Sequence, residues 1–345
     1  MSESGASMRA VIMERIGKPR VLKATRLARP QPGSGEALVK VHATSVNPVD
    51  LMLRSGRFIV RKPMPHILGA DLAGEIAQLG DDTGDWQPGD RVCACFEGLG
   101  SAIDGGYAEY CVLPADQLIA LPEALDYQSA AAAGAAFAAA FQALVINAKL
   151  KKADRVVIRG AAGSVGAAAV QITAARGAQV IAISESQFVG ELRDIGADIV
   201  LEDAGSDLAR QVNVATRENG ANLVLHCSER LDLDESLDML GAGGRLVIAG
   251  ALAKPQAKLN VMDLYLRNLS VLGAYGSIRP KDYESLLSSL ARGKYKALIQ
   301  AVMPLSQARK AHQQLEKSAG FGKIALVPDA VLEAAKQSEN RIPIT

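Results

Sequence analysis

The sequence predicts an α/β protein in which a β-barrel domain is joined to a doubly wound parallel sheet. The chain has 345 residues, which is too long for one ordinary hydrophobic core and favours two domains. Its first third is a series of short strand-like segments separated by Gly and Pro turns, as in a small barrel. From Gln128 onward, apolar strands and helical segments alternate, as they do in a parallel sheet with helices on both faces.

The barrel strands are expected within residues 9–125. The segment ALVKVHATSV (37–46) alternates between apolar and polar residues and is rich in β-branched side chains. Further strand-like segments follow at 71–80, 90–96 and 105–114, and turn sequences such as QPGD (87–90) separate them.

The parallel sheet is expected from six apolar segments with helical segments between most of them. The six are VVIRG (156–160), QVIAIS (179–184), ADIVLED (197–203), NLVLHCS (222–228), RLVIAGA (245–251) and LSVLGAYG (269–276). After residue 276, helices are expected at 281–293 and 306–318, and a returning strand at 323–328. The polar segment 330–345 is expected to be a loose tail.

Composition narrows the class of protein. Hydrophobic residues make up 49% and charged residues 22%, with a formal net charge of +1 and no sustained basic run. These values give no electrostatic reason to expect a nucleic-acid or membrane-surface partner. The N-terminus lacks the apolar region of a secretory signal, and the four cysteines are sparse, so we expect a cytoplasmic protein with free thiols. The charge-free, alanine-rich segment 129–148 is interpreted as a close-packed helix rather than a membrane span.

The stretch VVIRGAAGSVGAAAVQI (156–172) predicts a dinucleotide site. Gly163 would let the backbone approach a pyrophosphate, and Gly166 would let the next helix pack closely on the strand. The helix N-terminus would offer free N–H groups to the phosphates. The predicted contacts are Ala162, Gly163, Ser164, Val165 and Gly166. Ala161 stands where the fingerprint has its first glycine, and a plain tight turn is the alternative.

Further motifs carry a resemblance to a known family. They are NPVD (47–50) with RSG (54–56), HILGADLAG (66–74), GDRV (89–92), GGYAE (105–109), AAGSVG (161–166), GAD (196–198), GGRLV (243–247) and GKI (322–324). With them the chain resembles the medium-chain dehydrogenase/reductase superfamily, in its zinc-independent quinone oxidoreductase branch. The resemblance implies a GroES-like catalytic barrel from residues 1–126 and 277–345, a Rossmann domain from 127–276, and a nicotinamide in the cleft between them.

The resemblance also implies that no metal is bound. Zinc alcohol dehydrogenases of this superfamily use Cys, His and Cys ligands at positions that correspond to Asn47, Ala70 and about Ala135. Asn is a poor zinc ligand and Ala is none. The pair Cys93 and Cys95 is separated by one residue, so in a strand the two thiols point to opposite faces.

The expected reaction is hydride transfer to quinones, enones or enals. Asn47 is the candidate to donate from its amide to a carbonyl oxygen, or else only turns the backbone before a proline. Asp50 is expected to organise this loop through Arg54 rather than to transfer protons. Many relatives have Tyr where this chain has Met52, and Thr where it has Ala139, so this wall of the catalytic site is expected to be apolar.

The resemblance implies NADPH, with phosphate bound by Ser184 and Ser186 at the end of the second parallel strand. Glu185 and Asp203 are nearby, however, and the Lys or Arg expected at Gln187 or Phe188 is missing. NADH is therefore the alternative.

Further site residues follow from the same resemblance. Gly250, Tyr275 and Gly276 are expected to run past the nicotinamide. Lys323 either reaches the cofactor phosphates or extends from an edge strand. His226 either touches the cofactor ribose through its loop or caps that loop, and Cys227 is expected to be a buried thiol. In relatives the segment 269–276 pairs across a two-fold axis, which implies a homodimer.

The leading prediction is a zinc-independent NAD(P)H-dependent reductase of quinones or α,β-unsaturated carbonyls. An enoyl-thioester reductase is an alternative among enzymes. A structural or regulatory protein that binds the cofactor without turnover is the alternative from another class, suggested by the Met52 and Ala139 departures.

Overall fold

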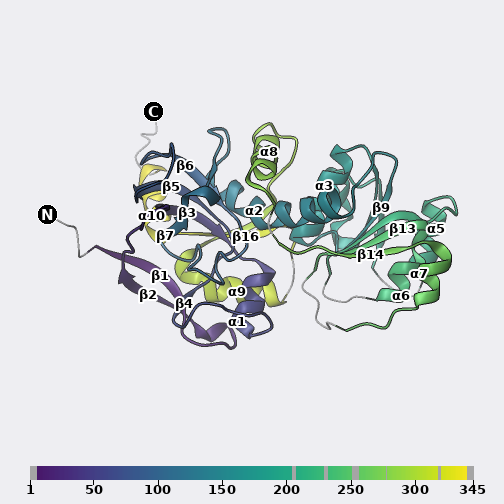
Figure 1. Ribbon diagram of the computed structural model, residues 1–345, viewed down its shortest axis with the longest axis horizontal. Coiled ribbons are helices and arrows are strands. Elements are labelled where there is room, and N and C mark those ends of the chain that lie inside the picture. The colour runs from purple at the N-terminus through teal and green to yellow at the C-terminus, as the bar shows by residue number, and fades with distance from the viewer. Residues whose placement is uncertain are drawn as a thin grey trace.

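The computed structural model describes residues 6–203, 207–228, 232–250, 256–276, 278–317 and 320–339. They form two sheet-based halves joined through one long helical segment (Figure 1). One half contains a curled, largely antiparallel seven-stranded sheet and the other a parallel six-stranded sheet. The predicted α/β class, a barrel-type half beside a doubly wound half, is confirmed. The domain boundaries at 126/127 and 276/277 stay a prediction.

Both ends of the chain build the barrel half. The larger sheet has the order β15-β16-β3-β5-β6-β8, with β7 on β3. Its strands are β3 (Glu36–Ser45), β5 (Leu72–Leu79), β6 (Arg91–Ala94), β7 (Tyr110–Pro114), β8 (Ile119–Ala120), β15 (Ile299–Pro304) and β16 (Lys323–Val327). The C-terminal strand β16 pairs antiparallel with β3 through Ala325 and Ser45. A three-stranded sheet is formed by β1 (Ser7–Met13), β2 (Leu22–Ala28) and β4 (His66–Ile67).

The helices of this half are short. They are η1 (Pro19–Val21), α1 (Pro48–Ser55), η2 (Ala115–Gln117), η5 (Leu305–Gln307), α9 (Ala308–Lys317) and α10 (Asp329–Glu339). α1 begins at the N-cap Asn47 with a proline in its first turn, and it ends at Gly56, whose φ of 79° is left-handed.

The parallel sheet has the order β11-β10-β9-β12-β13-β14. Its strands are β9 (Arg155–Arg159), β10 (Gln179–Ser184), β11 (Ile199–Glu202), β12 (Ala221–His226), β13 (Leu240–Ile248) and β14 (Ser270–Gly273). Its helices are α3 (Ser164–Ala175), η4 (Ser186–Phe188), α4 (Val189–Asp194), α5 (Leu208–Ala215), α6 (Leu233–Asp238) and α7 (Val261–Arg267).

Both faces of this sheet are buried, which explains the continuous apolar segments in the sequence. Val156 and Ile158 of β9 belong to the same hydrophobic cluster as residues of α3 and α4. Val157, which points to the other face, belongs to a second cluster with residues of α5, α6 and α7.

The segment Tyr127–Asn147, α2 (Tyr127–Phe141) continued by η3 (Gln142–Asn147), lies between the halves. It is long and apolar enough to cross a membrane, with a mean hydropathy of 1.7, but the core helix of a soluble protein passes the same test. It contacts α3 on one side and β3, β5 and β16 on the other. α8 (Pro280–Ala291) also packs on it.

The prediction of a loose C-terminal tail is wrong over most of its length. Residues 329–339 form α10, and Val331 and Leu332 pack against the central hydrophobic cluster. Ala, Glu, Lys and Gln favour a helix once two apolar residues anchor it. The remaining residues, 340–345, lie outside the described part of the chain.

Candidate active site

The glycine turn after β9 has the geometry that the sequence predicts. A Cβ on Gly166 would lie 2.2 Å from the backbone oxygen of Gly160, so glycine is required for α3 to approach the turn. A Cβ on Gly163 would meet only the Gly160 oxygen, at 3.3 Å, which leaves space above this residue. Gly163 is the N-cap of α3, and no side chain caps this end. The N–H groups of the first turn of α3 and the open space above Gly163 fit the pyrophosphate of a dinucleotide.

The other predicted cofactor residues gather at the same edge of the sheet. Ser184 ends β10, and Ser186 begins the turn that follows it. Gly250 follows β13, and a Cβ there would lie 3.0 Å from the Ser228 oxygen. Tyr275, 64% exposed, and Gly276, with a φ of 106°, follow β14. The carboxyl ends of parallel strands are where α/β sheets bind ligands, so these residues can share one nucleotide.

On the barrel side, Asn47 is buried in a polar network. Its Nδ2 donates to Asp71 Oδ2 at 2.8 Å and to the Ser45 oxygen at 3.3 Å. Its Oδ1 accepts from the Lys323 ammonium. Both amide hydrogens are therefore used inside the protein, and Asn47 is only 3% exposed. This corrects the expectation that the Asn47 amide donates to a substrate carbonyl.

Asp50 organises the loop, as predicted, but not through Arg54. Its carboxylate accepts from the Asn47 N–H at 2.9 Å, the Gly69 N–H at 3.1 Å and the Tyr107 hydroxyl at 3.3 Å. It thereby ties the start of α1 to the turn before β5. Burial, and then the nearby Asp71 carboxylate, raise the pKa of Asp50 to about 7.

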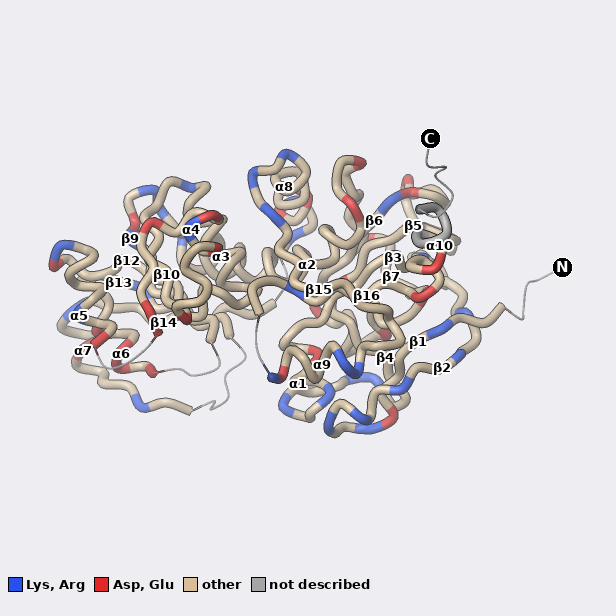
Figure 2. The backbone as a smooth tube through the Cα atoms, turned by 180° about the vertical axis from the view of Figure 1, so that it is seen from behind, with Lys and Arg blue, Asp and Glu red and all other residues tan. Residues whose placement is uncertain are grey.

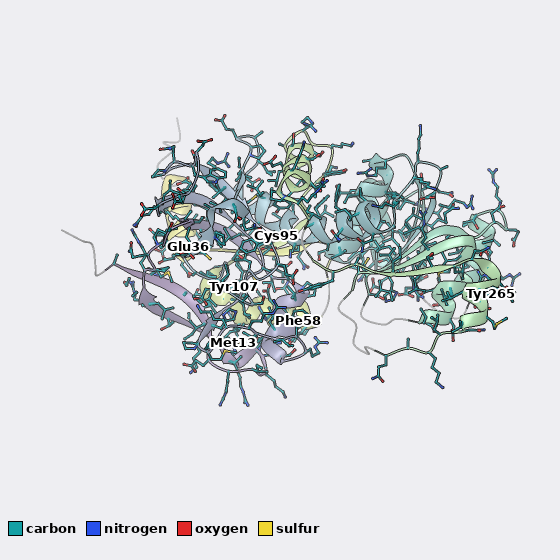
Figure 3. The ribbon with its side chains drawn as sticks, viewed as in Figure 1. Met13, Glu36, Phe58, Cys95, Tyr107 and Tyr265 are labelled. Atoms are coloured by element: carbon teal, nitrogen blue, oxygen red, sulfur yellow. The ribbon has the colours of Figure 1, made fainter. Side chains whose placement is uncertain are left out.

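Arg54 acts at the far end of a buried hydrogen-bond chain. Its Nε donates to Nδ1 of His312 at 3.3 Å. The proton of this imidazole therefore sits on Nε2, which lies 3.0 Å from the Tyr107 hydroxyl. Burial, and then Arg54, lower the pKa of His312 to about 3, so the ring is neutral. Arg54 also pairs with Glu316. Tyr107 lies inside the barrel half (Figure 3).

Lys323 is not on an edge strand, which corrects one of the two expectations for it. β16 lies between β15 and β3. The ammonium donates to the Val46 oxygen at 3.0 Å and to Asn47, and lies 3.9 Å from Asp71 Oδ2. Burial lowers the pKa of Lys323, and the Asp71 and Asp50 carboxylates oppose that shift. Lys323 also lines a small cavity with Ser164 of α3, so this residue stands at the junction of the halves.

The residues at the zinc positions do not fit zinc. Ala70 and Ala135 offer no donor atom, and the oxygen of Asn47 already accepts from an ammonium whose charge would repel a dication. Within the described ranges, no group of three or more His, Cys, Asp or Glu residues could hold a metal ion.

The remaining candidates have local roles. The Met52 carbonyl accepts from the N–H groups of Arg57 and Phe58, and its half-buried side chain makes this wall apolar. Nε2 of His226 lies 3.1 Å from the Ser228 oxygen and caps its own loop. Burial raises the pKa of Cys227 to about 12, so this thiol is unreactive at neutral pH.

Sequence reasoning missed three members of the network, namely Asp71, Tyr107 and His312. All three are buried and hydrogen-bonded to predicted residues or to each other. Asp71 and Tyr107 lie inside the segments 66–74 and 105–109, whose motifs carry the family resemblance. Nothing in the sequence separates His312 from an ordinary helix residue.

Comparisons with known proteins agree with this architecture. Residues 33–123 match the family described as alcohol dehydrogenase GroES-like domain, and residues 164–292 match the zinc-binding dehydrogenase family. The chain is 30% identical over 328 residues to the quinone oxidoreductase of Rattus norvegicus, covering 93% of this chain and 98% of that protein.

Two solved structures are similarly close. The crystal structure of AibC has a TM-score of 0.88 and 31% identity, covering 94% of this chain and 97% of the other. A structure described as NAD-dependent alcohol dehydrogenase has a TM-score of 0.86 and 30% identity, covering 93% and 99%. The chain therefore belongs to the medium-chain dehydrogenase/reductase superfamily of NAD(P)-dependent oxidoreductases, and is quinone oxidoreductase-like.

Proposed function

We propose that this protein is a zinc-independent NAD(P)H-dependent reductase that transfers hydride to quinones or α,β-unsaturated carbonyls. The observation that carries the proposal is the set Asn47, Ala70 and Ala135 at the zinc positions, with the Lys323 ammonium bound to the Asn47 oxygen. Such a site cannot polarise an alcohol oxygen through a metal.

The bound nicotinamide would supply the hydride, and the chain's own residues position it and exclude water. Gly163 and the N-terminus of α3 would hold the pyrophosphate. Asp50 fixes the start of α1 and the Gly69 turn through its backbone hydrogen bonds.

The apolar wall of the site favours hydride acceptors that need no hydrogen-bond donor from a side chain. The amide hydrogens of Asn47 are used internally, while Met52, Ala70 and Ala139 are apolar and half-buried. Reduction of a quinone produces an aromatic ring, so it depends less on a donor that stabilises negative charge than reduction of a simple ketone does.

The test is cofactor oxidation with a panel of a quinone, an enone, an enal and an enoyl thioester. We expect turnover with the quinone, unchanged after dialysis against a chelator. Gly163→Leu is expected to weaken dinucleotide binding at least about 100-fold, because its side chain fills the space of the pyrophosphate. The barrel should stay folded, as circular dichroism would report. Tight cofactor binding by the parent without turnover of any acceptor would favour the regulatory alternative, and turnover of the thioester alone would favour the enoyl-thioester reductase.

We further propose that the protein is a homodimer that pairs along β14. This strand is the edge of the parallel sheet, and α7 beside it exposes Val261, Met262, Tyr265 and Leu266, each between 57% and 74% exposed. Tyr265 lies on the outer end of this half (Figure 3). An apolar patch next to an open sheet edge is suited to a second copy.

The double variant Tyr265→Glu/Leu266→Glu is expected to be a monomer at concentrations where the parent is a dimer, because four buried charges would repel across the two-fold axis. Analytical ultracentrifugation measures this. The control is Val214→Glu, an equally exposed apolar residue on α5. A monomeric parent, or a dimeric double variant, would contradict the proposal.

A further inference from the structure

We propose that Glu185 makes the nucleotide site select NADH over NADPH. This inference rests on the dinucleotide site of the proposed function and names its ligand more closely. It departs from the NADPH that the family resemblance implies, and the reason lies in the tip of β10.

The tip of β10 lies directly beside the glycine turn. The N–H of Ala161 donates to the Ile183 oxygen at 3.1 Å, and Ile183 pairs with Arg159 in the parallel register of β9 and β10. In a Rossmann-type sheet the ribose of the adenosine lies over the end of this second strand. Residues that follow Ile183 therefore meet the 2′ position, where NADH has a hydroxyl and NADPH a phosphate.

Of the two serines expected to bind that phosphate, Ser184 is already used. Ser184 is 3% exposed, and its hydroxyl donates to Glu185 Oε2 at 3.1 Å. The hydroxyl therefore points at a carboxylate. Glu185 itself is exposed, so its carboxylate is free to accept hydrogen bonds from ribose hydroxyls, as the acid in this position does in NAD-binding sites.

Two more carboxylates stand at the same tip. Glu202 is the register partner of Ser184 on β11, and the N–H of Asp203 donates to the Ser184 oxygen at 2.8 Å. Both residues are exposed. Between Gln179 and Asp203, a range that is fully described, Arg193 carries the single positive side chain, and it lies in the last turn of α4.

The charges at this tip therefore oppose a 2′-phosphate. Recognition of a phosphate needs charge-assisted donors such as Arg. Three carboxylates instead repel a group with nearly two negative charges, while a neutral ribose is unaffected. Figure 2 shows Lys and Arg positions spread over this half. Arg159 ends β9, but its guanidinium pairs with Glu235 at 2.7 Å and donates to Ser236 at 2.9 Å.

The experiment is fluorescence titration of the full-length protein with NADH and with NADPH, without any substrate. We expect NADH to bind at least about tenfold more tightly at low salt. Rising salt should narrow the difference by strengthening NADPH binding, because salt screens repulsion between exposed charges. Glu185→Ser is expected to weaken NADH and strengthen NADPH, so that the ratio of the two dissociation constants falls about tenfold.

The matched control is Glu191→Ser, which removes an exposed carboxylate from α4 and should leave the ratio unchanged. Equal or tighter binding of NADPH by the parent would overturn the inference while leaving the proposed function intact. An unchanged ratio in Glu185→Ser would also overturn it. Failure of both nucleotides to bind would refute the proposed function itself, and the inference with it.

Discussion

Replacing Lys323 with Met is expected to destabilise the barrel half by about 3–5 kcal/mol, which is the range found when one partner of a buried ion pair is removed. The ammonium is 4% exposed and faces two fully buried carboxylates, Asp71 and Asp50. Met has a similar length but no charge, so the variant leaves the Asp71 carboxylate, and the half-ionised Asp50 with its pKa of about 7, without a compensating cation. Urea unfolding at pH 7 measures the loss.

Two further variants make this expectation specific. Adding Asp71→Asn to Lys323→Met removes one uncompensated charge and should recover about half of the loss. Lys317→Met, on the exposed end of α9, should change stability by less than about 0.5 kcal/mol. If Lys323→Met keeps the parent's stability but binds dinucleotide far more weakly, the expectation is contradicted. The ammonium would then bind the cofactor phosphates, which is one of the two roles that the sequence predicts for Lys323.

The parallel half was predictable because its signals are local. Strands buried on both faces read as continuous apolar segments, and the glycines of the turn follow one of them directly. The helix α10 was missed for the opposite reason. Its segment is mostly polar, and the contacts that hold it come from distant residues: Val331 and Leu332 pack on the core, and Ser306 donates to Asp329.

The polar network could be predicted only in part. Asn47 and Asp50 stand in one short motif, and the hydrogen bond from the Asn47 N–H to the Asp50 carboxylate at the start of α1 follows from a spacing of three residues. The partners that decide their chemistry come from elsewhere: Asp71 precedes β5, and Lys323 begins β16. No local pattern reports that an ammonium from residue 323 would occupy the oxygen of Asn47. The substrate contact first assigned to this amide was wrong for that reason.

Stability should fall as the solution is acidified from pH 6.5 to about 5, because burial keeps histidine rings neutral in the folded protein. Burial, and then Arg159, lower the pKa of His226 to about 4, and burial lowers that of His312 to about 3. Below pH 6.5 the unfolded chain binds a proton at each ring while the folded protein does not. Each histidine therefore costs about 1.4 kcal/mol of stability per pH unit in this window.

Asp50 acts in the opposite direction. Its folded pKa of about 7 lies above the ordinary aspartate pKa of 3.8, so between these values the folded protein holds a proton that the unfolded chain has lost. Its contribution to stability rises as pH falls, by about 1.4 kcal/mol per unit, and cancels that of His312. Both residues lie in the barrel half, whereas His226 lies in the parallel half. The net acid sensitivity therefore comes from His226, at about 1.4 kcal/mol per unit, with a further contribution from half-buried His42, whose pKa burial also lowers.

Urea unfolding at several pH values between 5 and 6.5 measures this slope. His226→Gln should reduce it by about 1.4 kcal/mol per unit, because the variant removes a proton whose uptake by the unfolded chain Asp50 does not offset. His312→Gln should also flatten the overall slope, because it leaves the effect of Asp50 unopposed. In this variant the barrel half should become more stable as pH falls, while the parallel half should still lose stability. Trp86 fluorescence separates the two variants, because it follows unfolding of the barrel half, where its indole donates to the Ala115 oxygen. Because the contributions of Asp50 and His312 cancel, a parent whose stability does not change over this range would show that burial does not hold the His226 ring neutral.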